Sequence, residues 1–178
     1  KELTVTIKGV TPLLISKMGV VETEQERKHV SQTPPTSEDI DLAERKLYKN
    51  DGYYCFPYTW IMEAIKAMSK REKEPGKRGG SYFKTIAAAV QIEPEWIPLK
   101  VSKLEIFGRY LKTKMRGDRV WAESPVFKEW QAIFNISVDT SIIKPQMVLH
   151  FLEEAGRLNG IGAWRPERGG RFGKFNVM

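Results

Sequence analysis

The feature that most constrains the fold is the order in which two kinds of hydrophobic periodicity follow each other. Residues 2–10 alternate apolar and polar side chains, and residues 132–138 do the same, which predicts half-buried strands. From Thr59 to about Arg71, and again from Pro145 to Leu158, apolar residues recur at the spacing of a helix. Strand-forming and helix-forming segments therefore alternate along the chain.

Each expected helix has a definable apolar stripe and definable ends. Thr59 is expected to cap the first helix, and proline suits the first position of the second, which ends at Asn159-Gly160. The stripe of the first helix consists of Ile61, Ala64, Ile65 and Met68, and that of the second consists of Val148, Phe151, Leu152, Ala155 and Leu158. Both helices should pack one face on a common core.

The remaining segments supply strands, turns and one insertion. A hairpin is expected around Asn50-Asp51-Gly52, followed later by a short helical or irregular piece at 82–92. Residues 99–114 are strand-like, with a turn at Gly117-Asp118. Residues 120–138 form either a strand pair or one long bent strand, with Ala132, Phe134, Ile136 and Val138 facing one way. The last strand lies at 172–177.

This element order predicts an α+β, ferredoxin-like (RRM-like) fold. It consists of a four-stranded antiparallel sheet with two helices on one face and an insertion after the first strand. The insertion is the polar, charged interval at about 20–46, expected to be exposed and partly helical near its end. At 178 residues the chain is expected to form a single domain, 1–178. The opposite face or an edge of the sheet is left for a partner.

Cysteine and histidine usage argues against disulfide and zinc chemistry. Cys55 is the single cysteine, in the apolar context YYCFPY, and is expected to be a buried, inert thiol. His29 and His150 are far apart, so we expect no metal and no cofactor. No apolar run approaches the roughly 20 residues that span a bilayer. We therefore expect no membrane contact and a reducing, cytoplasmic location.

Positive charge gathers in three short segments, at 66–84, 109–119 and 157–174. Together they hold more positive charge than the chain's net +7, so the remainder is acidic. The first and third segments are expected to meet beside the sheet as a groove for phosphates, with Tyr82, Phe83 and Trp164 exposed for base stacking. The alternative is that each segment is only a solvated face.

The third segment belongs to a terminal stretch, GIGAWRPERGGRFGKFNVM, that is rich in glycine. Glycine permits positive φ and close backbone approach, so exposed N–H groups there are expected to cradle phosphate oxygens; a helix cap and a turn are the plainer explanation. The candidate nucleic-acid-binding residues are Lys66, Lys70, Arg71, Lys77, Arg78, Arg109, Lys112, Lys114, Arg116, Gly162, Trp164, Arg165, Arg168, Gly170, Arg171, Gly173 and Lys174.

Several motifs resemble the RAMP superfamily of CRISPR-associated RNA-binding proteins. GIGAWRPERGGRFGKFNV is similar to the family's C-terminal glycine-rich loop: Gly160 and Gly162 match its first pair, and Gly169 or Gly170 with Gly173 match its second. VTIKGVTPLLI resembles its first strand, and YYCFPYTWIMEAIKAMSK resembles a proline-led turn into a basic helix of the backbone subunits. The resemblance implies ferredoxin-like folds that bind guide RNA, often as repeated subunits along one strand.

Three functions remain open at this stage. The first is non-catalytic binding of single-stranded nucleic acid, foremost guide RNA, as a repeated backbone subunit of a CRISPR-type ribonucleoprotein in antiviral defence; single-stranded DNA, in a phage protein, is an alternative ligand. The second is a RAMP-type endoribonuclease, for which His29 is the candidate acid or base and His150 is expected to be structural. Asp39 or Asp41 of the insertion would serve target cleavage. The third is an interaction protein with acidic partners. We expect a filament-forming protein that is not an enzyme.

Overall fold

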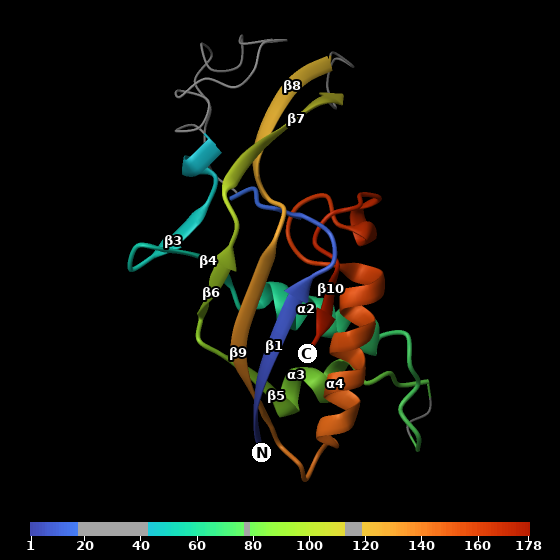
Figure 1. Cartoon of the computed structure of the whole chain (residues 1–178). Helices are drawn as coiled ribbons and strands as arrows, with labels where there is room; N and C mark the ends of the chain where they lie inside the picture. Colours follow the sequence, from blue (N-terminus) through green and yellow to red (C-terminus); the bar gives the residue numbers. More distant parts are fainter. Residues whose placement is uncertain (18–42, 77–78, 113–118) are drawn as a thin grey trace.

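The chain folds into a mixed α and β structure whose strands pair antiparallel in two sheets (Figure 1). The computed structural model describes residues 1–17, 43–76, 79–112 and 119–178, with the backbone alone at 109–112 and 119–122. Among these residues, no helix is long and apolar enough to cross a membrane.

The larger sheet has seven strands rather than the four that the periodicity predicted. Its order is β10-β1-β9-β6-β4-β3, and β5 also pairs with β9. The strands are β1 (Glu2–Gly9), β3 (Tyr48–Asn50), β4 (Tyr53–Pro57), β5 (Val90–Glu93), β6 (Trp96–Val101), β9 (Trp130–Val138) and β10 (Phe175–Val177). No separate strand was predicted at β6, because its Pro98 is a residue that interior strands usually avoid.

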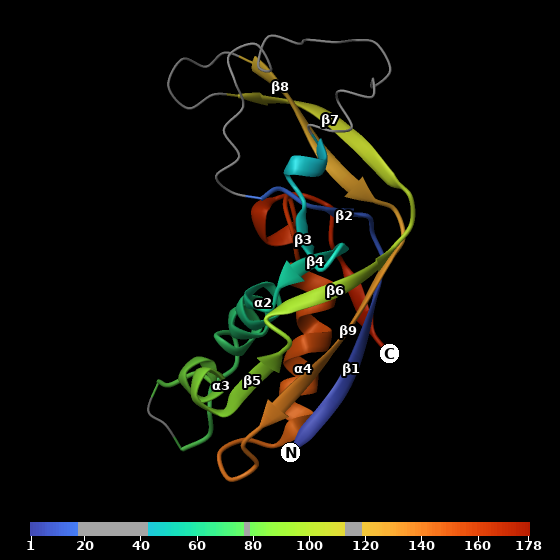
Figure 2. The ribbon, with the colours of Figure 1, turned by 90° about the vertical axis from the view of Figure 1, so that its left-hand side faces the viewer.

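Four of these strands form two pairs that are each connected through helices, and in both cases another strand lies between the two connected ones. β1 leads through α2 (Thr59–Ser69) and α3 (Phe83–Ala89) to β5, and β9 lies between β1 and β5 in the sheet. β9 leads through α4 (Pro145–Glu154) to β10, and β1 lies between those two strands. Figure 2 shows α2, α3 and α4 on one side of this sheet. The other side, which faces the viewer in Figure 1, is called the open face below.

The smaller sheet consists of β2 (Leu13–Leu14), β8 (Arg119–Phe127) and β7 (Leu104–Lys112), in the order β2-β8-β7. β8 and β9 follow each other with only Lys128 and Glu129 between them, and they pair with different strands. Residues 120–138 therefore form two consecutive strands that do not pair with each other, rather than one long bent strand. The expected turn at Gly117-Asp118 lies outside the described residues.

One hydrophobic core fills the space between the larger sheet and the helices. The predicted inward residues of β9 are all buried, as are Val5 and Ile7 of β1. The four predicted stripe residues of α2 are buried too, together with Met62. Thr59 does not cap this helix: Tyr58 stands at the N-cap and no side chain bonds there.

The second helix ends differently from the prediction. Val148, Phe151, Leu152 and Ala155 are buried as expected, but Leu158 is 37% exposed while Asn159 is buried. The cause is a π-helical turn at Ala155–Asn159, which holds more residues per turn and so shifts the following side chains around the axis. Gly160 then ends the helix with φ +68°, as predicted.

The hairpin and the insertion can be compared with expectation only in part. β3 and β4 form the predicted hairpin, with Asp51 and Gly52 both at positive φ as a two-residue turn requires. Residues 18–42 of the expected insertion are outside the described part of the chain. The last residues of that interval form a short helical turn in which Ala43 and Lys46 are buried, so this end belongs to the folded body. Cys55 is buried, and burial raises the pKa of its thiol.

Candidate nucleic-acid interface

The glycine-rich stretch, residues 160–174 and called the glycine loop below, is tied by its backbone to the other end of the chain. The N–H of Ala163 donates to the carbonyl of Leu14 at 2.8 Å, and that of Gly173 donates to the carbonyl of Pro12 at 2.8 Å. The N–H of Lys174 donates to Oγ1 of Thr11 at 2.9 Å. The loop is therefore an ordered partner of the segment around β2.

Glycine is needed in this loop for close backbone contact. Gly173 has φ +73°, and a Cβ there would overlap the carbonyl oxygen of Ile161; a Cβ on Gly170 would overlap the carbonyl oxygen of Trp164. Most described amides of the loop are used internally. The amides that donate are those of Gly160, Ile161, Ala163, Arg168, Gly169, Gly170, Phe172, Gly173 and Lys174. These amides are therefore not exposed donors, and the expectation that successive exposed N–H groups cradle phosphates is wrong for them.

The basic side chains of the loop differ in their availability. Arg165 is half-buried; its Nε donates to Glu167 at 2.8 Å and its Nη1 donates to the carbonyl of Gly162 at 3.1 Å, so it braces the loop. Arg168 is 70% exposed and 4.0 Å from Glu167. Arg171 is exposed, with its guanidinium 5.6 Å from the centroid of the Phe172 ring. Arg168 and Arg171 thus present the loop's charge outward.

An aromatic cluster joins the glycine loop to the second basic segment. Phe107 of β7 lies 5.9 Å from Trp164 and 5.0 Å from Phe172 between ring centroids, and the two loop rings are 5.8 Å apart. Buried Leu14 and Val126 complete the cluster. Trp164 is half-buried in it, so the expected exposed stacking ring is wrong for this residue. The structure thereby brings the third basic segment against the strand that carries the second.

Some of the second segment's candidates can be located only by strand. Arg109 and Lys112 lie on β7, two and five residues beyond Phe107, with only their backbone described. Lys114 and Arg116 lie outside the described residues, as do Lys77 and Arg78 of the first segment.

The first segment lies apart from the glycine loop. The loop meets α2 near its start, where Trp60 is 3.6 Å from the position of a Cβ on Gly162. Lys66 and Lys70 follow on the same helix, about 9 and 15 Å further along the axis. Their ammonium groups lie 6.0 and 4.6 Å from the centroid of Phe83, and both Phe83 and Tyr82 are half-buried rather than exposed.

Acidic partners surround the exit of α2. Nε2 of His150 lies 2.8 Å from Oε1 of Glu72, so this histidine links α4 to the α2 exit in the structural role expected for it. Arg157 donates to Glu154 at 2.8 Å and holds the pKa of that carboxyl below its usual value, with a smaller contribution from Arg71. Arg71 of the first segment and Arg157 of the third therefore both lie near Glu154, and the phosphate groove expected between the two segments stays a prediction.

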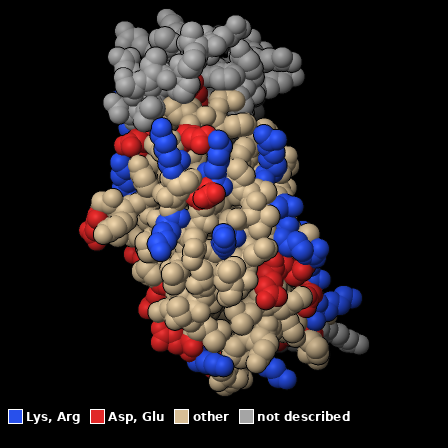
Figure 3. Space-filling model, in the orientation of Figure 1, with Lys and Arg blue, Asp and Glu red and all other residues tan. Residues whose placement is uncertain are grey.

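Sequence reasoning passed over a set of residues on the open face. Lys8, Gln131 and Lys100 lie in register on three neighbouring strands. Figure 3 shows basic side chains in the middle of this face, above a broad uncharged area. The alternation of β1 and β9, which was used to find the core, also places these residues outward.

Comparison with known proteins gives little further information. No family model matches the sequence, and no curated protein matches it. Among solved structures, the fold is similar to the crystal structure of Cmr6 from Pyrococcus furiosus, with a TM-score of 0.46 and 9% identity over 100% of this chain and 98% of that one. Similarity at this level does not assign the chain to a family.

Proposed function

We propose that this protein binds single-stranded nucleic acid without cleaving it. The observation that supports the proposal is the Phe107–Trp164–Phe172 cluster, which holds the basic glycine loop against the strand carrying Arg109 and Lys112. Two basic segments distant in sequence thus form one body, with Arg168 and Arg171 exposed on it. The guanidinium groups of exposed arginines suit bidentate hydrogen bonding with phosphate oxygens.

The finer proposal concerns fold, ligand and setting. We propose that β10-β1-β9-β5 with α2 and α4 constitutes a ferredoxin-like unit, since its strand order and helical connections follow the split βαβ pattern. With the resemblance of the glycine motifs to the RAMP superfamily, this favours guide RNA as the ligand, in a cytoplasmic CRISPR-type complex of repeated subunits. A phage-type protein that binds single-stranded DNA is the second candidate.

The position of His150 favours a binding role over an endoribonuclease activity. His150 is engaged with Glu72, away from the glycine loop, and the loop's own carboxylate, Glu167, accepts a hydrogen bond from Arg165. His29, Asp39 and Asp41 are outside the described residues, so cleavage is addressed by experiment: incubation of labelled RNA with wild type and a His29→Ala variant. Cleavage by wild type that is lost in this variant would replace the binding proposal by the enzymatic one.

The binding proposal is tested with a labelled, unstructured RNA of about 30 nucleotides and with matched single- and double-stranded DNA across a salt series. Losing one phosphate contact with a single strand should reduce the magnitude of the slope of log K against log salt by about 0.7. At 0.1 M salt this corresponds to about 5-fold lower affinity. Arg168→Ala/Arg171→Ala should therefore weaken binding by about 25-fold. Lys1→Ala/Lys144→Ala removes the same charge at exposed positions outside the three basic segments and is the control. Equal losses in both variants, or no binding by wild type, would refute the proposal.

A further inference from the structure

The open face carries a polar row that crosses four strands. Strand register places Lys100 opposite Gln131, Gln131 opposite Lys8, and Lys8 opposite Asn176. Directly paired residues of antiparallel strands project to the same face, so these four side chains, called the polar row below, lie side by side. Lys8, Lys100 and Asn176 are exposed. The row consists only of cations and amides.

An uncharged strip runs beside the polar row. Ile133, opposite Thr6, is 49% exposed, and Tyr53 at the start of β4 is 69% exposed. Together with Pro98, these side chains and the stems of Lys100 and Gln131 line a hollow of about 220 Å³. A flat phenol ring that is mostly exposed next to an ammonium group offers a surface on which an unpaired base can stack.

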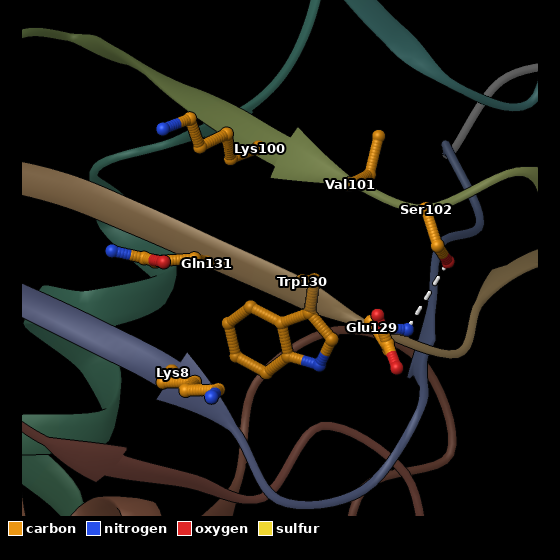
Figure 4. A pocket seen from close by; sticks show the side chains of 7 residues that line it. All are labelled: Lys8, Lys100, Val101, Ser102, Glu129, Trp130 and Gln131. Atoms are coloured by element: carbon orange, nitrogen blue, oxygen red, sulfur yellow. Dashed lines mark hydrogen bonds between the residues drawn. The ribbon is translucent and has the colours of Figure 1, made fainter.

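The floor of the row is held rigidly. Figure 4 shows Lys8 and Lys100 on either side of Gln131, with the ring of Trp130 next to Gln131 and Lys8; these residues line a second hollow of about 260 Å³. Trp130 is 3% exposed, and its Nε1 donates to the carbonyl of Thr11 at 2.9 Å. A ligand that lies across the row would therefore meet positions fixed by strand pairing and by this ring.

We propose that the polar row is a second contact for the same nucleic-acid strand that the glycine loop binds. Lys8 and Lys100 hold phosphates, the amides of Gln131 and Asn176 donate to sugar or base oxygens, and Tyr53 stacks one base. The proposal rests on the proposed function. β10 makes the path continuous, because Lys174 ends the glycine loop and Asn176, two residues later, ends the row.

Charge and spacing favour a nucleic acid over a protein partner. The two lysines stand two strand spacings apart, about 10 Å, which is the scale of a flexible phosphate backbone. Neither has a carboxylate partner among the described residues. Carboxylates bound the row instead: Glu129 lies at one side of the Trp130 hollow, and Glu93 and Glu95 line a hollow near the far end of β9. An anionic chain is therefore directed across the strands rather than along them.

The test compares four variants with wild type on RNAs of two lengths, about 6 and about 30 nucleotides, by fluorescence anisotropy. Lys8→Ala/Lys100→Ala should weaken the long RNA by about 25-fold at 0.1 M salt and lower the salt slope by about 1.4, since two phosphate contacts are lost. Tyr53→Ala should weaken it by about 5-fold, and Tyr53→Phe should leave it unchanged. The control pair Lys1→Ala/Lys144→Ala removes the same charge outside the three basic segments and the polar row.

The outcomes separate this proposal from the first one. If wild type binds RNA, Arg168→Ala/Arg171→Ala weakens it, and Lys8→Ala/Lys100→Ala behaves like the control, the polar row is refuted while the glycine loop stands. Failure of wild type to bind any nucleic acid refutes the proposed function itself. If Lys8→Ala/Lys100→Ala leaves RNA affinity unchanged and Ile133→Glu abolishes self-association in sedimentation, the open face is a protein interface and the proposal is overturned.

Discussion

Gly169 and Gly173 allow the role of backbone contact in the glycine loop to be measured directly. Their φ values are nearly the same, +72° and +73°, so alanine is equally strained at both positions. They differ in space: nothing lies within 4 Å of a Cβ on Gly169, whereas a Cβ on Gly173 would overlap the carbonyl oxygen of Ile161. Gly173 also accepts the N–H of Ile161 at 2.9 Å. The pair therefore separates conformational strain from contact.

The expected free energies follow from these two terms. Positive φ costs an alanine about 1–2 kcal/mol, and the reduced entropy of the unfolded chain returns about 0.4–1 kcal/mol. Gly169→Ala should therefore destabilise the protein by about 1 kcal/mol. At Gly173 the overlap adds about 1–3 kcal/mol, as overpacking typically does, for a total of about 2–4 kcal/mol. Against a total stability of about 5–15 kcal/mol, that difference is readily measured.

The assay is urea unfolding of wild type and both variants, followed by circular dichroism. Unchanged m values would show that the same surface is exposed on unfolding in all three proteins. Equal midpoint shifts for Gly169→Ala and Gly173→Ala would contradict the reasoning, because the tight contact between residues 161 and 173 would then contribute nothing.

Two further predictions concern the same end of the molecule. Phe172 is 3% exposed in the aromatic cluster, so Phe172→Ala should lower the free energy of unfolding in urea by about 3–5 kcal/mol and weaken RNA binding. Phe172→Leu should lower it by less than about 1.5 kcal/mol. Equal losses in both variants would argue against the cluster. The hydrogen bond from Arg157 lowers the pKa of Glu154 from its usual 4.5, so its stabilisation is present above that pH and is lost as pH falls through the lower folded value. Glu154→Gln should therefore flatten the decline of Tm below about pH 4.5, and an unchanged decline would refute this.

Local periodicity predicted the elements that lie deepest in the fold. β1, β9 and both long helices appear where alternation or helical spacing placed them, because one face of each is buried in the same core. The turn at Asp51-Gly52 was predictable for a different reason, since two consecutive positive φ values favour those residues. These signals are contained within a few residues of sequence.

The features that were missed depend on partners distant in the chain. β6 contains Pro98, which the register places opposite Cys55 of β4, and no local pattern announces that pairing. β6 joins the predicted hairpin of β3 and β4 to β9, and this extends the sheet from four strands to seven. The π-turn at Ala155–Asn159 is similar: it places Asn159 in the interior and turns Leu158 outward, contrary to its apolar character.

The glycine loop shows why pattern alone misassigned a mechanism. A run of glycines looks the same whether it exposes N–H groups to a phosphate or lets two backbones touch. What decides between these is the segment from Thr11 to Leu14, about 150 residues earlier in the chain, which accepts the N–H groups of Ala163, Gly173 and Lys174. The glycines thus allow the backbone contacts that hold the loop in place, and in the proposed function the exposed side chains of Arg168 and Arg171 contact the ligand. Alanine at Gly173 should therefore reduce stability first, whereas alanine at Arg168 and Arg171 should reduce affinity and leave stability unchanged.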